Sequence, residues 1–415
     1  MGCLAQICMK DSLEVGIWSS PKNTLQDYHI LRNCGVTHAF IDENYCKRGS
    51  AEYLKILEYC KEAGLKAYVF NYNDVQKFLE DDSPYSDYEA FEGMVVYDEP
   101  GIHQLDEIAS VIPEFEKRYP NGVFYVNLLP NYGLQFDKNK DNPDWFESTQ
   151  YELYIKEYCE KVLDKLHGKK ILSVDFYPLV TIPEEEKVFL EKGWLRNLEL
   201  VTFYAKKHGA LPYWYIQSTS FGAWRREPKE KDFSYQYFVC LAYGIRGINH
   251  FTYTSPIGGE FAEKDIALID RNNLPSDKYF YVKELNQRIG PLCDELFTYD
   301  YVGTKAVLGS KQPNWREKEN IEELQLNLNE LCEMRIASAT RSLLVGEFEN
   351  HQGRHVYLLV NFTDPYREEN SQVTIDFEKE RSISYTYKNR QYNHTCRTLT
   401  LDIESGEGVL LRFED

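Results

Sequence analysis

The strongest constraint in this sequence is a repeated alternation of short β-branched and aromatic runs with longer amphipathic stretches. Eight runs are candidate strands: Val15–Trp18, Thr37–Ile41, Lys66–Phe70, Met94–Tyr97, Val123–Val126, Ile171–Phe176, Pro212–Gln217 and Gly247–Phe251. The stretches between them repeat apolar residues every three or four positions, as helices do: Ala51–Ala63, Ile102–Tyr119, Tyr151–His167, Glu184–His208 and Phe233–Tyr243. This alternation over roughly 285 residues predicts a (β/α)8 barrel, the TIM barrel.

An open, doubly wound parallel sheet would show the same alternation and is the competing fold. That fold carries a glycine-rich phosphate-binding turn after an early strand, and the sequence has no such turn there. A helical stretch over Lys278–Leu296 completes the barrel pattern. We therefore predict a barrel domain over residues 1–300.

From about Tyr301 the chain changes to short alternating runs separated by turn residues such as Gly353. The candidate strands are Ala306–Leu308, Ser342–Phe348, His355–Asn361, Val373–Phe377, Ser382–Tyr387, Thr398–Ile403 and Gly408–Phe413. They predict a small antiparallel β-sandwich domain over residues 301–415. The charged stretch Arg316–Leu331 fits either a helix or an excursion between strands.

The charge balance narrows the classes of partner. The chain has 47 Lys and Arg against 66 Asp and Glu, a formal net charge of −19, and it lacks a basic run, so we expect it to bind neither nucleic acid nor an anionic membrane. It has no apolar run long enough to cross a bilayer, and Met1–Asp11 lacks the pattern of a secretory signal. This predicts a cytoplasmic protein, unless a leader has been removed. The oligomeric state stays open, with a homo-oligomer as one option.

Cofactor and metal motifs are not found. The 10 cysteines are scattered without CxxC or CxxH pairs, which is typical of reduced thiols. His103, His208 and His250 have no histidine partner at a metal-binding spacing. The Gly-x-Ser-x-Gly nucleophile elbow is also absent. We therefore expect no cofactor and no metal site.

Acidic residues follow the predicted fourth strand. In a TIM barrel the carboxyl ends of all strands meet on one face, so residues there should line one pocket. The segment Gly93-Met-Val-Val-Tyr-Asp-Glu-Pro-Gly101 ends an apolar strand in Asp98 and Glu99, and Pro100 is expected to hold Glu99 extended. Two adjacent carboxyl groups in an apolar pocket should raise one of their pKa values. A group that protonates a leaving-group oxygen needs such a pKa.

Asp175, at the end of the sixth predicted strand, is expected to face Glu99 and to supply a second carboxylate. For each of these acids the structural alternative is a turn residue that binds backbone amides. Aromatic rings stack on sugar faces, and amides, carboxylates and phenols bind sugar hydroxyls. The substrate-binding candidates near the strand ends are Trp18, Glu43, Asn71, Asn127, Tyr177, Tyr215, Gln217, Trp224 and Tyr253.

These motifs together resemble the clan A glycoside hydrolases. The resemblance rests on Asp98-Glu-Pro100, Asn127-Leu-Leu-Pro130, Asp175-Phe-Tyr-Pro178 and the trailing β domain. More closely, the chain resembles poorly characterised bacterial barrels related to the family 42 β-galactosidases. The clan A motif on strand four is Asn-Glu-Pro, so the resemblance implies a glycosidase acting on a carbohydrate. It implies Glu99 as general acid/base and Asp98 in place of the Asn that contacts the 2-hydroxyl.

One departure from the clan A pattern affects the mechanism. Clan A places a nucleophilic Glu at the end of strand seven, where this chain has only Gln217, which cannot form a glycosyl ester. One interpretation is that Asp175 or Asp98 supplies the second carboxylate. A second is that the substrate supplies its own 2-acetamido nucleophile, because adjacent Asp98 and Glu99 also resemble the family 20 hexosaminidases. A third is a non-catalytic carbohydrate-binding barrel.

Overall fold

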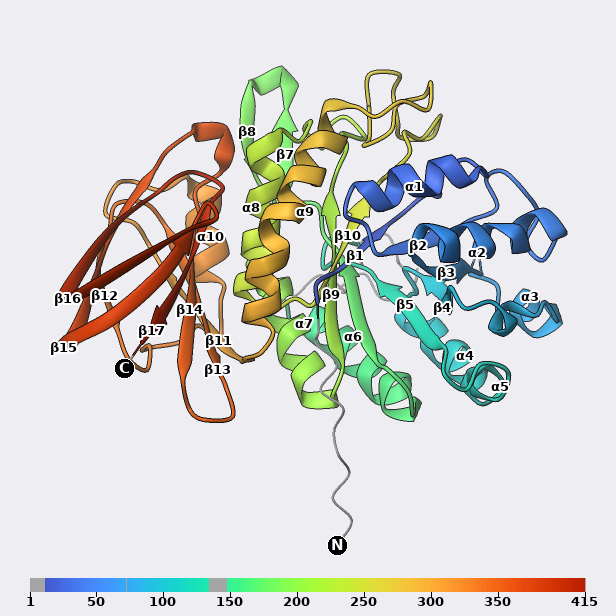
Figure 1. The fold of residues 1–415 in the computed structure, drawn as a ribbon, viewed down its shortest axis with the longest axis horizontal. Coiled ribbons are helices and arrows are strands. Elements are labelled where there is room, and N and C mark those ends of the chain that lie inside the picture. Colours follow the sequence, from blue (N-terminus) through green and yellow to red (C-terminus); the bar gives the residue numbers. More distant parts are fainter. Residues whose placement is uncertain (1–11, 72, 134–147, 415) are drawn as a thin grey trace, which may run out of the picture.

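A closed barrel of eight parallel strands forms the larger part of the molecule (Figure 1). The structure is a computed structural model that describes residues 12–71, 73–133 and 148–414, so Met1–Asp11 lies outside the described residues. Around the barrel the strands run in the order β1, β10, β9, β6, β5, β4, β3 and β2. Their bounds are β1 (Glu14–Ile17), β2 (His38–Ile41), β3 (Lys66–Phe70), β4 (Phe91–Asp98), β5 (Val123–Leu128), β6 (Ile171–Asp175), β9 (Leu211–Gln217) and β10 (Gly247–Phe251). The predicted TIM barrel is confirmed.

The barrel strands are apolar because they are buried on both faces. Every residue of β2, β5 and β6 is buried. Side chains that point inward fill the barrel with packed rings, among them Phe40, Tyr68, Tyr125, Tyr213 and Tyr215. A parallel sheet covered by helices produces such continuous apolar runs, whereas a sheet with one wet face would alternate.

Helices cover the outside of the barrel. They are α1 (Leu25–Asn33), α2 (Ala51–Ala63), α3 (Val75–Glu80), α4 (Leu105–Ser110), α5 (Ile112–Arg118), α6 (Ser148–Lys161), α7 (Trp194–His208), α8 (Glu230–Ala242) and α9 (Asp277–Leu296). In the described part of the chain, none of the helices is long and apolar enough to cross a membrane.

Three helix predictions need correction. The stretch 102–119 is divided between α4 and α5, because Pro113 in the first turn of α5 has no N–H to continue the earlier helix. The stretch 184–208 begins with part of the hairpin β7 (Leu179–Ile182) and β8 (Lys187–Leu190), and helix α7 starts only after Gly193, whose φ is +84°. The helix predicted over 151–167 ends at Lys161 and is followed by a short turn.

The predicted antiparallel β domain is confirmed as a seven-stranded sheet that bends over its own core in a sandwich-like way. The order is β11, β13, β14, β17, β15 and β12, with β16 beside β15. The bounds are β11 (Asp300–Val307), β12 (Arg335–Ala339), β13 (Leu343–Glu349), β14 (His355–Asn361), β15 (Ser371–Tyr387), β16 (Arg390–Ile403) and β17 (Gly408–Phe413). The first half of β15 pairs with β12 and the second half with β17, which produces the bend.

Three details of this domain differ from the prediction. The ambiguous stretch 316–331 is helical only in its first part, where α10 spans Trp315–Glu322. Strand β12 was not predicted, because most of its residues are exposed or half-buried and it has no apolar alternation. The runs predicted separately over 373–377 and 382–387 form the single strand β15.

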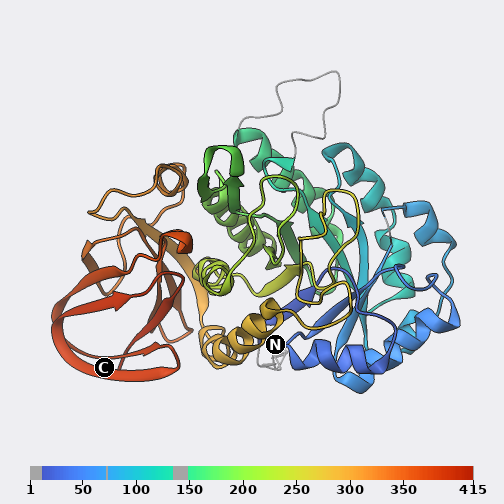
Figure 2. The same ribbon diagram turned by 90° about the horizontal axis from the view of Figure 1, so that it is seen from above.

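The C-terminal sheet packs against helix α8 on one side of the barrel (Figure 2). The approach is close, because a Cβ added to Gly346 of β13 would lie 2.3 Å from the carbonyl oxygen of Ala242 in α8. Helix α9 ends at Leu296 and β11 begins at Asp300, and we propose residue 300 as the boundary between the two domains.

Candidate active site

A cavity of about 660 Å³ opens at the carboxyl ends of the barrel strands. The structure brings eight of the predicted site residues together in its wall: Trp18, Asp98, Glu99, Asn127, Asp175, Tyr177, Tyr215 and Trp224. The predicted catalytic acids Asp98, Glu99 and Asp175 are therefore neighbours in space. Their convergence follows from barrel geometry, since the strands that carry them end on the same face.

Four predicted site residues lie elsewhere. Gln217 is fully buried, where its side chain accepts from the backbone N–H of Leu179 at 3.2 Å and donates to the carbonyl of Arg226 at 2.7 Å. Tyr253 is buried in the main hydrophobic core. These two residues stabilise the fold and do not line the cavity.

The other two residues outside the cavity wall contact Arg48. Asn71 is fully buried, accepts from the guanidinium of Arg48 at 2.6 Å and donates to the carbonyl of Asp74 at 2.9 Å. Glu43 is exposed, and its carboxylate accepts from the backbone N–H of Arg48 at 2.6 Å. Through Arg48, these side chains connect the loop after β2 to the loop after β3.

Three carboxyl groups form one connected cluster in the cavity wall. The amide nitrogen of Asn127 donates to Asp98 at 3.2 Å and to Asp175 at 3.3 Å, and the carboxyl groups of Asp175 and Glu99 are hydrogen-bonded to each other. The oxygen of Asn127 accepts from the hydroxyl of Ser173 at 2.9 Å, which orients its NH₂ group towards the acids. We call Asp98, Glu99 and Asp175 the carboxyl cluster.

Glu99 has an unusual backbone conformation. Its φ is +51°, so the expectation that Pro100 would hold it extended is wrong. A left-handed conformation costs a residue other than glycine about 1–2 kcal/mol, and neighbouring contacts must hold it. The N–H of Glu99 donates to the carbonyl of Asn127 at 2.8 Å, and the side chain of Asn73 bonds to both backbone groups of Asp98. These contacts fix the turn that presents Glu99 to the cavity.

Burial and mutual repulsion raise the pKa values of the carboxyl cluster. Burial, followed by the charge of Glu99, raises the pKa of Asp98 to about 8. Asp175 is 5% exposed, and burial and the charges of Glu99 and Asp98 raise its pKa well above the usual range. Burial also raises the pKa of Glu99. The hydrogen bond from Asp175 lowers this pKa and the charge of Glu260 raises it, but burial is the largest effect. Asp98 therefore keeps its proton at neutral pH, and the shifts of Asp175 and Glu99 favour their protonated forms, which a general acid requires.

These raised pKa values predict a stability that falls as the pH rises. A carboxyl whose pKa is higher in the folded protein than in the unfolded chain binds more protons when folded. The cost of ionising it in the folded state is absent below the usual pKa of about 4 and grows as the pH rises through the folded value, which is about 8 for Asp98. We expect the free energy of unfolding to fall more steeply across this range in the wild type than in Asp98→Asn, by urea denaturation. Parallel pH profiles would contradict the raised pKa.

Arg225 and the acid beside it were not predicted as site residues. The guanidinium of Arg225 lies 3.0 Å from the carboxylate of Glu191, donates to the carbonyl of Tyr177 at 2.5 Å and lies 4.9 Å from the ring centre of Tyr132. Arg225 follows the predicted Trp224 directly in the sequence, and this adjacency is the signal that could have indicated it. Glu191 lies after the β7–β8 hairpin, in a stretch predicted as a helix.

Glu260 also lines the cavity, from the long loop between β10 and α9. Burial raises its pKa, and the charge of Arg225 opposes the shift. A loop position of this kind carries no strand-end signal, which explains why the sequence did not indicate it.

Aromatic rings form much of the remaining wall. Trp18 packs edge-on against Phe70 and Tyr215, with ring centres 4.9 and 5.8 Å apart. Trp224 is 55% exposed and also lines the cavity. A concave site with rings and converging polar groups suits a small polar ligand that has apolar faces.

The sequence matches no protein-family model and no curated protein. Solved structures are similar to it. The GH42 β-galactosidase Gan42B from G. stearothermophilus matches over 97% of this chain and 98% of its own, with 8% sequence identity and a TM-score of 0.50. The β-galactosidase from Bacillus circulans sp. alkalophilus matches over 97% and 99%, with 8% identity and a TM-score of 0.49. The endo-β-1,4-mannanase from Thermotoga petrophila matches over 95% and 97%, with 9% identity and a TM-score of 0.41.

The similarity to Gan42B concerns the fold and extends over nearly the whole of both chains. It agrees with the order of domains in this protein, a TIM barrel followed by an antiparallel β domain. The chain therefore has a fold similar to that of Gan42B, as the sequence resemblance implied. Fold alone does not assign a reaction, so the function is argued from the site.

Proposed function

We propose that this protein hydrolyses a glycosidic bond, with Glu99 as general acid and base. The observation that carries the proposal is the carboxyl cluster of Asp98, Glu99 and Asp175, whose pKa values are all raised, in a cavity that is also lined by aromatic rings. The fold shared with a GH42 β-galactosidase supports the same class of reaction. The substrate is then a carbohydrate, which agrees with the rings and polar groups of the wall.

The proposed reaction starts with Glu99 in its protonated form. As Glu99 gives its proton to the glycosidic oxygen, the second carboxylate bonds to the anomeric carbon. The bond from that carbon to the oxygen breaks, the alcohol departs, and a glycosyl ester forms. Asp175 is hydrogen-bonded to Glu99, so the pair can share a proton before and after this step. The Glu99 carboxylate then accepts a proton from the water that attacks the anomeric carbon, and the ester bond breaks to release the sugar and the second carboxylate.

The second carboxylate is the part of the mechanism with more than one candidate. We propose Asp175 or Asp98 for this role, because both belong to the carboxyl cluster. A retaining pair of carboxyl groups is about 5–5.5 Å apart and an inverting pair about 6.5–9.5 Å, while hydrogen-bonded carboxyl groups lie closer. Glu260 is therefore a further candidate, since its charge reaches Glu99 from a different element.

Matched substitutions separate these candidates. If Asp175 is the second carboxylate, Asp175→Asn should lower sugar release by about 10²-fold or more, while Glu260→Gln changes it only a few-fold. The control is Glu263→Gln, an exposed carboxylate of the same loop outside the cavity wall. A large loss in Glu260→Gln with little change in Asp175→Asn would move the role to Glu260.

A substrate-assisted hexosaminidase is the second candidate function. Two observations favour it: Asp98 lies beside Glu99 in the cavity wall, and β9 ends in Gln217, whose amide is buried and hydrogen-bonded to the backbone. In such an enzyme the Asp orients a 2-acetamido group that attacks the anomeric carbon. Hydrolysis of N-acetylhexosaminides, without hydrolysis of the matching plain hexosides, would select this mechanism.

A further inference from the structure

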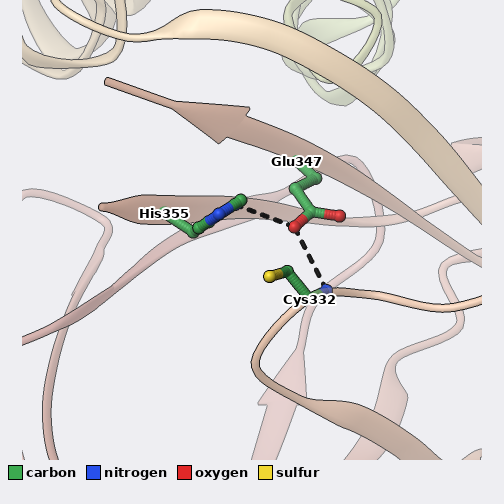
Figure 3. Close-up of side chains that lie close together, drawn as sticks. All are labelled: Cys332, Glu347 and His355. Atoms are coloured by element: carbon green, nitrogen blue, oxygen red, sulfur yellow. Dashed lines mark hydrogen bonds and ion pairs between the residues drawn. The ribbon is translucent and has the colours of Figure 1, made fainter. Parts of the chain in front are cut away.

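A second cluster of metal-ligating side chains lies in the C-terminal sheet. It consists of Cys332, which precedes β12, Glu347 on β13 and His355 on β14 (Figure 3). One ligand atom from each residue lies within 4.8 Å of the other two. These residues do not line the candidate active site, so the cluster is independent of the function proposed above.

Strand pairing and one loop contact bring the three residues together. Strands β13 and β14 are antiparallel, with Glu347 opposite Tyr357, so His355 occupies the diagonal position on the same face. The backbone N–H of Cys332 donates to the carboxylate of Glu347 at 3.2 Å. Tyr357 donates to the same carboxylate at 3.2 Å, which fixes its orientation. The site therefore depends on register and not on a local sequence motif.

His355 faces the carboxylate of Glu347 across the strand pair. Its Nδ1 lies 2.9 Å from Oε1 of Glu347, an ion-pair distance. Imidazole nitrogen and carboxylate oxygen are both ligands that Zn²⁺ takes in proteins. The other ring nitrogen, Nε2, lies 4.0 Å from the carboxylate of Glu349. A metal-binding histidine usually donates from its second nitrogen to an acceptor such as a carboxylate, and Glu349 lies on that side of the ring at an ion-pair distance that is too long for a hydrogen bond.

The charge around the cluster also favours a cation. The side chain of Glu347 is 3% exposed, and a buried carboxylate needs a compensating charge. A divalent ion would offset the charge of Glu347, and with one carboxylate and one thiolate as ligands the site would be neutral.

We propose that Cys332, Glu347 and His355 bind a zinc ion. Sulfur, oxygen and nitrogen donors together suit Zn²⁺, and water completes a four-coordinate shell. The Cys332 thiol loses its proton to solvent when the ion binds. The ion would join the segment before β12 to β13 and β14, which makes the site a structural clamp of the C-terminal sheet.

The test uses the full chain, freed of metal with a chelator and titrated with Co²⁺ as the probe. We expect one ion per chain and a thiolate-to-cobalt charge-transfer band that Cys332→Ser abolishes. Glu349→Gln removes a residue that contacts a ligand and not the ion, so it should weaken Co²⁺ binding by roughly 10–100-fold. His355→Gln removes a ligand itself and should weaken Co²⁺ binding by more than this. The control is Cys396→Ser, a half-buried cysteine of β16 outside the cluster, which should leave the band unchanged.

A second measurement covers variants that fail to fold. In the wild type, Zn²⁺ should slow alkylation of the exposed Cys332 thiol at least ten-fold without changing the alkylation of Cys396. The proposal is wrong if Co²⁺ gives no charge-transfer band and Zn²⁺ does not protect Cys332. Binding that is unaffected by both Cys332→Ser and His355→Gln would equally overturn it.

Discussion

Glu99→Gln should lower the release of sugar from an accepted glycoside by about 10²-fold or more and leave oligosaccharide binding in place. Glutamine keeps the size of the side chain but cannot give a proton to the glycosidic oxygen. The backbone contacts that hold residue 99 at φ +51° come from the N–H of Glu99 and from Asn73 on Asp98. They do not involve its carboxyl group, so the variant should fold normally.

Leaving-group dependence makes the Glu99 test specific. Aryl glycosides whose phenol leaves readily need less protonation, so Glu99→Gln should lose less activity on them than on an oligosaccharide. The loss should appear in kcat more than in KM. The control is Glu107→Gln, an exposed carboxylate on α4. Full activity in Glu99→Gln on every accepted glycoside would remove Glu99 from the mechanism.

Arg226→Met should lower the free energy of unfolding by about 3–5 kcal/mol, because it leaves two buried carboxylates without their cation. Arg226 binds Asp232 through two bonds of 2.7 and 2.8 Å, and it binds Asp364 at 2.7 Å. The side chains of Asp232 and Asp364 are each 2% exposed. Asp232 lies on α8 and Asp364 follows β14, so the loss falls on the contact between barrel and sheet.

Urea denaturation at neutral pH measures this loss. The control is Arg335→Met, because Arg335 and Asp376 form a pair at 2.8 Å with the arginine side chain 77% exposed. An exposed pair contributes about 0–1 kcal/mol, so the control should change little. The Arg226→Met deficit should shrink at low pH, where the two carboxyl groups can be protonated. Equal losses in the two variants would contradict a structural role for the buried arginine.

The fold could be predicted where burial determined the sequence pattern. Barrel strands such as β2 and β6 are buried on both faces, so they appear as apolar runs between amphipathic helices. Prediction failed where local chemistry decided the structure. Pro113 interrupts a helical pattern, and the exposed strand β12 has no pattern that separates it from a loop.

The candidate site divides in the same way. Asp98, Glu99 and Asp175 could be predicted because barrel topology brings strand ends together whatever the loops do. Glu191 and Glu260 depend on loop paths that periodicity does not encode. Gln217 shows the opposite error, since a strand-end position does not fix the direction of its side chain, and here the amide is used in the interior.

The most direct test of the central claim is to incubate the wild-type protein with a panel of aryl glycosides and oligosaccharides and to measure released sugar. The panel should include plain hexosides and N-acetylhexosaminides, because the residues of the site do not identify which sugar binds. We predict that at least one member is hydrolysed. Hydrolysis of a plain hexoside would indicate direct displacement, and hydrolysis of N-acetylhexosaminides alone would indicate acetamide-assisted displacement. If an oligosaccharide binds by calorimetry and is recovered intact, with no release from any member, the protein is a carbohydrate-binding barrel and not a glycosidase.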